Sequence, residues 1–191
     1  CLWRAGPDFC IYRGVYGINN KDPKEIQQAV RQVRPTCMCS VPRFWEKAYL
    51  AIEEQIHKMP AVKRKLVRYA INTGRVRNLD YVRHGRKVPS LLERRYKFFD
   101  KRIFEPVRRA IGIDHGNIFP TAGAPLAPAI VTFCHSIGIN IVVGYGLSET
   151  TATVTCFPDT GYVIGSVGTV LPEIEVKIGA DNEILVKGPT V

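Results

Sequence analysis

Residues 117–150 have the sequence NIFPTAGAPLAPAIVTFCHSIGINIVVGYGLSET. An apolar segment at 117–120 enters a Gly–Ala–Pro turn, and residues 126–138 have the pattern of a helix that a glycine ends. β-Branched residues at 139–143 predict a second strand, which is followed by glycines. A strand, a helix and a second strand in this order predict a parallel pair whose two following turns lie at one edge of the sheet.

The turn after the second strand, GYGLSET, combines three kinds of chemistry. Ligands of open α/β sheets bind beyond the carboxyl ends of the strands. At that place Gly144 and Gly146 allow a close backbone approach or a positive φ, and Tyr145 offers a flat face for a purine. Ser148 offers a hydroxyl to a phosphate oxygen, and Glu149 is a hard oxygen ligand suited to Mg²⁺. The alternative is a tight turn in which Ser148 and Glu149 only cap a short helix.

The turn after the first strand, TAGAP at 121–125, is a weaker signal. Gly123 removes side-chain bulk, and Pro125 fixes the backbone that follows. Such a turn can border a planar ring and offer main-chain hydrogen bonds. It is equally an ordinary connection between a strand and a helix.

Taken together, the two turns resemble motifs of the AMP-binding, adenylate-forming superfamily. GYGLSET resembles its glycine–tyrosine–glycine–x–threonine–glutamate signature, and TAGAP resembles the glycine–alanine–proline turn that precedes it. VPRFWEKAY at 41–49 resembles a valine–proline–x–x–tryptophan segment of long-chain fatty acyl-CoA synthetases. Residues 165–178 and 183–191 resemble later segments of the same subfamily, so the resemblance covers most of the chain in the right order.

The resemblance implies a nucleotide site built from both turns. The first turn would border the adenine, and Tyr145 would stack on it. Ser148 stands where the family usually has threonine and would still supply a hydroxyl to phosphate, and Glu149 would bind Mg²⁺, so these two would be the catalytic residues. The nucleotide-binding set would be Gly123, Ala124, Pro125, Gly144, Tyr145, Gly146 and Ser148.

Trp45 matches a tryptophan that gates the acyl tunnel in some members of the subfamily. The resemblance therefore implies a gate at this position. The alternative is a tryptophan that anchors its helix on the core, as large aromatic side chains commonly do.

The family's reaction has two steps. A fatty acid carboxylate attacks the α-phosphate of ATP to give acyl-AMP and pyrophosphate, and coenzyme A then displaces AMP to give the thioester. Positioning and Mg²⁺ would stabilise the charge that builds at phosphorus. The resemblance thus implies a long-chain fatty acid, ATP, Mg²⁺ and coenzyme A as substrates and cofactors of a longer parent protein.

Several segments of the family have no counterpart in these 191 residues. They are the Ser/Thr/Gly-rich phosphate loop with its lysine, the Thr–Gly–Asp segment that holds the ribose, and the small C-terminal domain with the catalytic lysine. The first residue is Cys1 rather than Met. We therefore interpret the chain as an internal fragment of the large N-terminal domain, and we expect it to be inactive as a ligase on its own.

The overall pattern predicts an α/β fold: a partial parallel sheet with flanking helices, a basic helical insertion and a β-rich C-terminal part. We expect a partial α/β AMP-binding subdomain at 1–160, with the insertion at about 43–115. Alternating apolar residues in IEVKI and EILVKG predict antiparallel strands in a β-rich subdomain that begins at 161. Residues 9–41 predict a further strand–helix–strand unit of the parallel sheet, ending in a buried strand at 36–41.

The net charge of +10 is unevenly distributed. Residues 43–110 carry nineteen basic and seven acidic groups, whereas residues 111–191 carry two basic and seven acidic groups. The basic segment has three interpretations: a solvated helical surface, a peripheral contact with an anionic membrane, or a nucleic-acid site. Nucleic acid is the least favoured, because no recognised motif is present and the acidic part would repel phosphate.

Composition narrows the class of protein further. No apolar run approaches the ~20 residues of a membrane-spanning helix. The six cysteines have neither zinc-site spacing nor a redox CxxC, so we expect reduced, buried thiols in a cytoplasmic protein, with peripheral membrane association as an open interpretation.

Two rival functions stay open. One is a different adenylate-forming enzyme, such as a fatty acyl-AMP ligase or an aryl or amino-acid activating domain; the helical insertion and VPRFWEK favour the long-chain subfamily instead. The other is a non-enzymatic basic binding module, which predicts no affinity for adenosine and ordinary packing roles for Tyr145 and Glu149.

Overall fold

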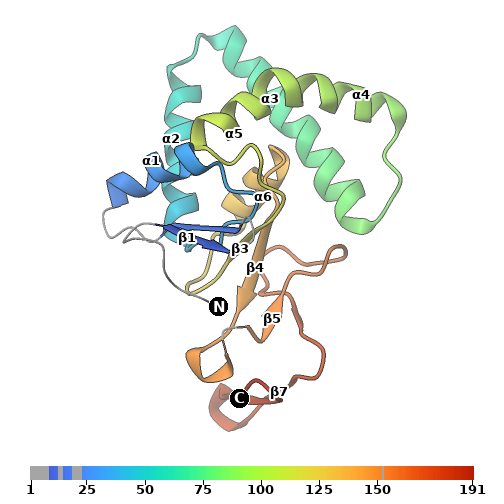
Figure 1. The fold of residues 1–191 in the computed structure, drawn as a ribbon. Helices are drawn as coiled ribbons and strands as arrows, with labels where there is room; N and C mark the ends of the chain where they lie inside the picture. Colours follow the sequence, from blue (N-terminus) through green and yellow to red (C-terminus); the bar gives the residue numbers. More distant parts are fainter. Residues whose placement is uncertain (1–8, 13–14, 19–22, 152) are drawn as a thin grey trace.

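The computed structural model of the chain describes residues 9–12, 15–18, 23–151 and 153–191. They form an α/β fold around a four-stranded sheet with the strand order β3–β4–β5–β6, beneath a layer of helices (Figure 1). The strands are β3 (Phe119–Thr121), β4 (Ile141–Tyr145), β5 (Thr155–Cys156) and β6 (Thr169–Val170).

The strand–helix–strand unit predicted from residues 117–150 is confirmed. β3 leads into α6 (Pro128–Ser136), which is followed by β4, and β3 and β4 pair in parallel with Thr121 opposite Val143. Pro128 occupies the first turn of α6, where its missing N–H costs no hydrogen bond. The helix ends as predicted before Gly138, whose φ of 77° an L side chain would resist.

Residues 36–40 lie beside β3 and run parallel to it. The Asn117 N–H donates to the Thr36 carbonyl at 2.8 Å, and the Ser40 N–H donates to the Pro120 carbonyl at 2.9 Å. The segment forms two isolated bridges, and both Cys37 and Cys39 are exposed. The predicted direction is therefore confirmed, but the prediction of a buried strand with buried cysteines is wrong here. Cys37 and Cys39 are alternate residues of an extended segment and therefore share one face, and this face is exposed to solvent.

The expectation that residues 9–41 form a strand–helix–strand unit of the parallel sheet is also wrong. β1 (Phe9–Tyr12) and β2 (Val15–Ile18) pair with each other in antiparallel fashion as a sheet of their own. Two residues separate β1 from β2, which suits an antiparallel hairpin, and residues 36–40 beyond α1 bridge to β3 instead of β2. The predicted helix is present as α1 (Pro23–Val33).

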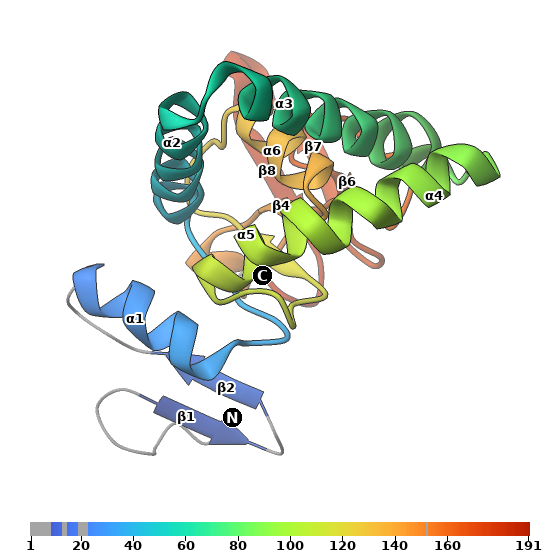
Figure 2. The ribbon, with the colours of Figure 1, turned by 90° about the horizontal axis from the view of Figure 1, so that it is seen from above.

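The basic segment at 43–110 is helical, as predicted. Its helices form a layer over the sheet, in which α3 and α4 run across the molecule on the side nearest the viewer in Figure 2. Gly74 in α3 allows a close approach of α6, because a Cβ at this position would meet the Ser136 carbonyl oxygen at 1.9 Å. The elements are α2 (Pro42–Lys58), α3 (Ala61–Arg75), η1 (Val76–Tyr81), η2 (Val82–His84), α4 (Ser90–Phe99), η3 (Asp100–Phe104) and α5 (Glu105–Ile111).

The C-terminal residues form the predicted antiparallel pair. β7 (Glu175–Ile178) and β8 (Ile184–Lys187) are joined through η5 (Ala180–Asn182), with Val176 opposite Val186. The four-stranded sheet includes β6 and so continues past residue 160. The division of the chain at 160/161 stays a prediction.

The core lies between the helical layer and the sheet. Trp45, Phe104, Phe119 and Ile141 are each at most 1% exposed, and α6 is buried between α3 and the sheet. Burial of side chains of this size stabilises a fold by roughly 1.5–3 kcal/mol each. Within the described residues, none of the helices combines the length and the apolar character needed to cross a lipid bilayer.

Candidate functional site

Both predicted turns leave the same edge of the sheet. Because Thr121 at the end of β3 pairs with Val143, two residues before the end of β4, the chain enters the two turns from neighbouring strands, ~4.8 Å apart. The arrow of β4 in Figure 1 points away from α3 and α4, so this carboxyl edge lies on the side opposite the helical layer. This is the position at which open α/β sheets bind ligands.

The first turn is open to solvent. Gly123 has a φ of 92°, and a Cβ built on it would meet no atom within 4 Å. Ala124 and Pro125 are exposed beside it, whereas Leu126 is buried and anchors the end of the turn. The backbone geometry therefore requires glycine for its positive φ, while the space above the turn is free for a ligand.

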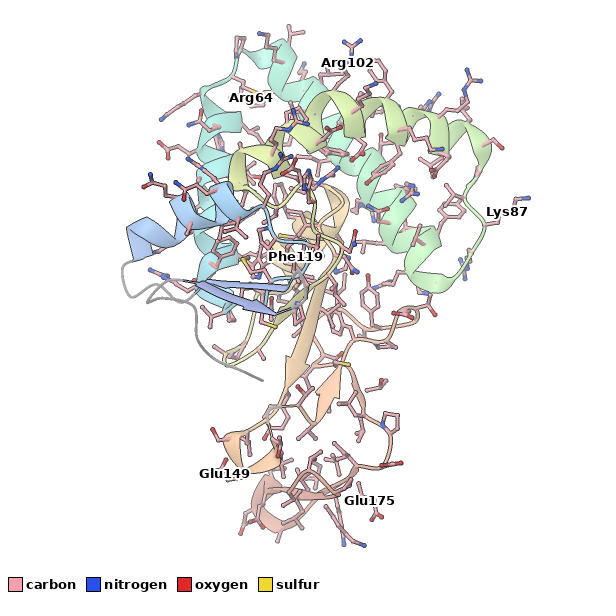
Figure 3. The ribbon with its side chains drawn as sticks, viewed as in Figure 1. Arg64, Lys87, Arg102, Phe119, Glu149 and Glu175 are labelled. Carbon is pink, nitrogen blue, oxygen red and sulfur yellow. The ribbon has the colours of Figure 1, made fainter. Side chains whose placement is uncertain are left out.

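Hydrogen bonds of Thr150, and not of Ser148 or Glu149, close the second turn. The Leu147 N–H donates to Thr150 Oγ1 at 3.0 Å, and the Thr150 hydroxyl lies 3.0 Å from the Leu147 carbonyl. Thr150 is 3% exposed, whereas Ser148 and Glu149 are exposed, and neither makes a side-chain hydrogen bond to a described residue. The capping alternative for Ser148 and Glu149 is thus wrong, and Figure 3 places Glu149 at the rim of the molecule.

Gly144 has a packing role that the sequence interpretation missed. Gly144 and Gly146 are not among the residues with positive φ. A Cβ on Gly144 would lie 2.8 Å from the Thr155 carbonyl oxygen, so the close neighbour that requires glycine is the backbone of β5. Of the two predicted reasons for these glycines, a positive φ is therefore wrong, and a close approach of a ligand stays a prediction.

Tyr145 is held in place by its main chain. It pairs with Thr155 in β5, and its carbonyl accepts the Val154 N–H at 2.8 Å. Its side chain is half-buried at the end of β4, directly before the turn that carries Ser148. These bonds fix the backbone at the end of β4 from which the ring projects.

Trp45 lies in the core and bonds to the start of the first turn. It is 0% exposed, and its Nε1–H lies 2.7 Å from Ser40 Oγ and 2.8 Å from Thr121 Oγ1. Its ring packs edge-on against Phe119 at 5.5 Å between centroids. This is the environment expected for a tryptophan that anchors its helix, and a role as a tunnel gate stays a prediction.

Hydroxyl residues that sequence reasoning missed thus fix both turns. Thr121 begins the first turn and Thr150 ends the second, and each is at most 3% exposed. The available signal was a threonine at the boundary of each glycine turn. Thr151, next in the chain, donates from Oγ1 to the Thr190 carbonyl at 2.8 Å, which joins the end of the described chain to this turn.

A buried histidine lies at the start of β4, at the end of the strand opposite the candidate site. His135 of α6 has Nε2 3.0 Å from the Ile141 carbonyl, so Nε2 carries the proton and Nδ1 accepts the Tyr162 hydroxyl at 3.2 Å. Tyr162 also stacks on Phe157, with 4.6 Å between ring centroids. Burial is the main cause that lowers the pKa of His135 to about 4, so the ring is neutral near pH 7.

The donor set at the edge suits a hard cation shared with a phosphate ligand. Among the described residues, no three His, Cys, Asp or Glu side chains gather as a metal cluster. Mg²⁺ needs only one or two carboxylates, because it keeps waters and binds phosphate oxygens, and an exposed Glu149 meets that need. A separate recess of about 420 Å³, lined by Lys101, Glu105, Pro106, Arg109 and Ala110, lies on the helical layer and not at the sheet edge.

Comparison with known proteins gives consistent matches. The sequence profile of the family described as AMP-binding enzyme matches residues 10–191. Long-chain-fatty-acid–CoA ligase FadD15 of Mycobacterium bovis is 32% identical over 174 residues, which are 89% of this chain and 28% of that protein. Long chain acyl-CoA synthetase 7, peroxisomal, of Arabidopsis thaliana is 30% identical over 179 residues, which are 92% of this chain and 24% of that protein.

The chain is also similar to a solved structure, that of O-succinylbenzoate coenzyme A synthetase from Bacillus subtilis in complex with ATP and magnesium ion. The TM-score is 0.43 and the sequence identity is 14%, and the match covers 88% of this chain and 26% of that chain. The chain spans about a quarter of the length of the curated relatives named above, 28% of one and 24% of the other.

Proposed function

Because the chain belongs to the family of AMP-binding enzymes, we propose that it forms the adenylate-binding part of an ATP-dependent long-chain fatty acid–CoA ligase. The observation that carries the proposal is the pairing of Thr121 with Val143, which brings two glycine turns to one sheet edge. The names of the relatives from Mycobacterium bovis and Arabidopsis thaliana support a long-chain fatty acid as the acid that is activated.

The first turn borders the adenine in this proposal. The open space over Gly123 supports that role, because a planar ring can approach the backbone without meeting a side chain. Ala124 and Pro125 complete the border, and Tyr145 stacks on the ring from the neighbouring strand. Gly144 and Gly146 keep the path between the turns free of side chains, although Gly144 is also required by β5.

The second turn contacts the phosphates. Ser148 donates its hydroxyl to a phosphate oxygen, and Glu149 holds Mg²⁺ together with phosphate and water oxygens. Both side chains are exposed without protein partners among the described residues, which supports a role toward a ligand. When bound, Mg²⁺ supplies positive charge that offsets the charge developing on the phosphoryl oxygens.

The parent enzyme forms acyl-AMP from the fatty acid and ATP, and then acyl-CoA from acyl-AMP and coenzyme A. This chain's contribution is to hold and orient the adenosine and phosphate groups at the sheet edge, a kind of positioning that lowers barriers substantially. We propose that the isolated chain has negligible ligase activity. Its cytoplasmic location also stays a prediction.

A binding measurement tests the nucleotide site on this chain. A stable acyl-adenylate analogue with a long acyl chain is titrated calorimetrically, with and without Mg²⁺. We expect saturable binding that Tyr145→Leu weakens by about 5- to 100-fold, the range measured for loss of base stacking. We expect Mg²⁺ to strengthen the binding of ATP to the wild-type chain and to have no such effect on Glu149→Gln.

The matched control for the carboxylate is Asp159→Asn, which removes the charge of another exposed acidic side chain away from the turn. This variant should leave the affinity for the acyl-adenylate analogue and the affinity for ATP with Mg²⁺ unchanged. If both variants lost the Mg²⁺ dependence of ATP binding equally, the loss would come from the change in net charge, and this result would contradict the role of Glu149. Tighter binding of an aryl adenylate than of the long-chain analogue would favour the aryl-activating alternative.

A further inference from the structure

The helical layer presents a surface on which basic and apolar side chains alternate. On α3 the apolar side chains Val62, Leu66 and Tyr69 follow one another at helical spacing and are 80%, 52% and 50% exposed. On α4, Leu91 and Phe98 lie two turns apart on the outer face and are 60% and 57% exposed. We call the exposed side chains of α3, α4 and η3 the helical face.

Contacts between rings join the two helices into one face. Tyr69 of α3 lies 5.8 Å from Phe99 of α4, and Phe99 lies 5.5 Å from Phe98, measured between ring centroids. The Arg102 guanidinium is 5.6 Å from the centre of the Phe98 ring. The apolar and the cationic groups therefore lie side by side rather than on opposite sides of the layer.

Most exposed cations of the helical face are free of carboxylates; the exceptions are Arg68, which pairs with Glu53, and Lys97, which lies near Glu93. α3 contains no acidic residue. Glu93 in α4 is bonded to Arg77, and Asp100 in η3 is bonded to Arg108, so both carboxylates are engaged by arginines outside α4 and η3. Six other exposed cations have no described carboxylate within ion-pair distance: Lys63, Lys65, Arg94, Arg95, Lys101 and Arg102.

Charge is segregated along the molecule. Figure 3 places Arg64 and Arg102 at the end of the helical layer, and Glu149 and Glu175 at the opposite end. Residues 43–110 carry nineteen basic and seven acidic groups, and residues 111–191 carry two and seven. A negatively charged plane would thus attract the helical end and repel the other, which fixes one orientation of the protein on it.

We propose that the helical face binds the surface of an anionic lipid bilayer. Cations alone would suit any polyanion, but exposed valine and leucine side chains gain nothing from a phosphate backbone, whereas they lose water when they enter the boundary between headgroups and acyl chains. Basic residues close to an anionic leaflet add an attraction that salt screens. The face therefore matches a lipid surface better than a nucleic acid.

Vesicle co-sedimentation of the 191-residue chain tests the proposal. The chain should bind phosphatidylcholine vesicles that contain phosphatidylserine and should not bind pure phosphatidylcholine. Binding should fall as the Debye length shrinks from about 10 Å at 0.1 M salt to about 3 Å at 1 M. The assay contains no nucleotide, so its outcome is independent of the proposed ligase function.

Two variants and one control locate the contact. Neutralising Arg94, Arg95, Lys101 and Arg102 to glutamine should weaken vesicle binding by at least about a hundredfold. A control that loses the same charge elsewhere (Lys47, Arg86, Lys87 and Lys177 to glutamine) should weaken it by less than about tenfold, because charges more than a Debye length from the membrane act weakly. A double variant, Leu66→Ser with Val62→Ser, should keep its charge and yet bind more weakly. All altered side chains are exposed, and circular dichroism verifies that each variant is folded.

Three results would overturn the proposal. They are equal weakening by the helical variant and its control, absence of binding to anionic vesicles, and binding to RNA or DNA in place of vesicles with the same loss in the helical variant.

Discussion

The Nε1–H of Trp45 lies 2.8 Å from Thr121 Oγ1, and this bond joins helix α2 to the residue at which β3 turns toward the candidate site. Ser40 Oγ lies 2.7 Å from the same nitrogen. Trp45 is fully buried, so its N–H has no access to water if these acceptors are lost. The tryptophan therefore positions the first turn through Thr121.

Trp45→Phe should destabilise the chain by about 2–4 kcal/mol, because it removes a buried hydrogen bond and leaves a cavity. Thr121→Val should cost less, because the indole N–H keeps Ser40 as an acceptor. Urea unfolding followed by circular dichroism measures both. If Trp45→Phe instead left stability unchanged and altered only the affinity for long acyl chains, Trp45 would be a gate rather than an anchor.

His135 should make stability depend on pH between 4 and 6.5. Burial lowers the pKa of this ring from its ordinary value of 6.5 to about 4, so in this window the unfolded chain binds a proton that the folded chain does not. The unfolding free energy should therefore fall as the pH falls, by about 3 kcal/mol over the whole window. His135→Gln, whose amide can still donate to the Ile141 carbonyl, should lose this dependence.

The exposed histidines provide the control for that experiment. His57→Gln should leave the pH profile as it is in the wild-type chain, because the side chain is in water in both states. Persistence of the full profile in His135→Gln would assign the dependence to another group.

The ion pair between Arg34 and Asp114 should hold α1 against the loop after α5. The Arg34 guanidinium donates to both carboxylate oxygens of Asp114, and Asp114 is 3% exposed. This contact lowers the pKa of Asp114 to about 2, so its contribution should be complete above pH 3.8 and lost as the pH falls toward 2. Asp114→Asn should cost about 1.5–3 kcal/mol at neutral pH. The exposed pair of Lys58 and Glu54 is the comparison, and Glu54→Gln should have a much smaller effect on stability, because water screens the pair.

Two glycines with positive φ should differ in their tolerance of alanine. Gly168 and Gly161 have φ values of 89° and 76°, but a Cβ on Gly168 would lie 2.0 Å from the Cys156 carbonyl atoms, whereas one on Gly161 would meet nothing within 4 Å. Gly161→Ala should cost about 1 kcal/mol of backbone strain alone. Gly168→Ala should cost more than about 3 kcal/mol, because β5 and β6 must separate. Equal melting temperatures of the two variants would contradict this close approach.

The parts of the fold that sequence predicted correctly are those with strong local signals. The helix between β3 and β4 has a proline in its first turn and a glycine beyond its end, and β7 and β8 alternate apolar residues at period two. The segment with Cys37 and Cys39 was predicted as buried because it is apolar between two prolines. Its burial depends on which elements cover it, and hydrophobicity alone does not specify that.

The candidate site was predictable in its chemistry but only partly in its geometry. The sequence placed Tyr145, Ser148 and Glu149 after a strand; the structure places Ser148 and Glu149 there and makes Tyr145 the last residue of β4. Thr150 closes the turn through a local bond to Leu147, but that Gly144 faces β5 rather than open space depends on pairing between β4 and β5. Such contacts link segments that no local pattern connects.

The most direct test of the shared nucleotide site is a titration of the ¹⁵N-labelled chain with ATP and Mg²⁺, followed by amide resonances. The account predicts that the largest shifts occur together at Gly123 and Ala124 and at Tyr145 to Glu149, and that Glu149→Gln removes the part that depends on Mg²⁺. Shifts confined to the basic helices, or to one turn without the other, would contradict it.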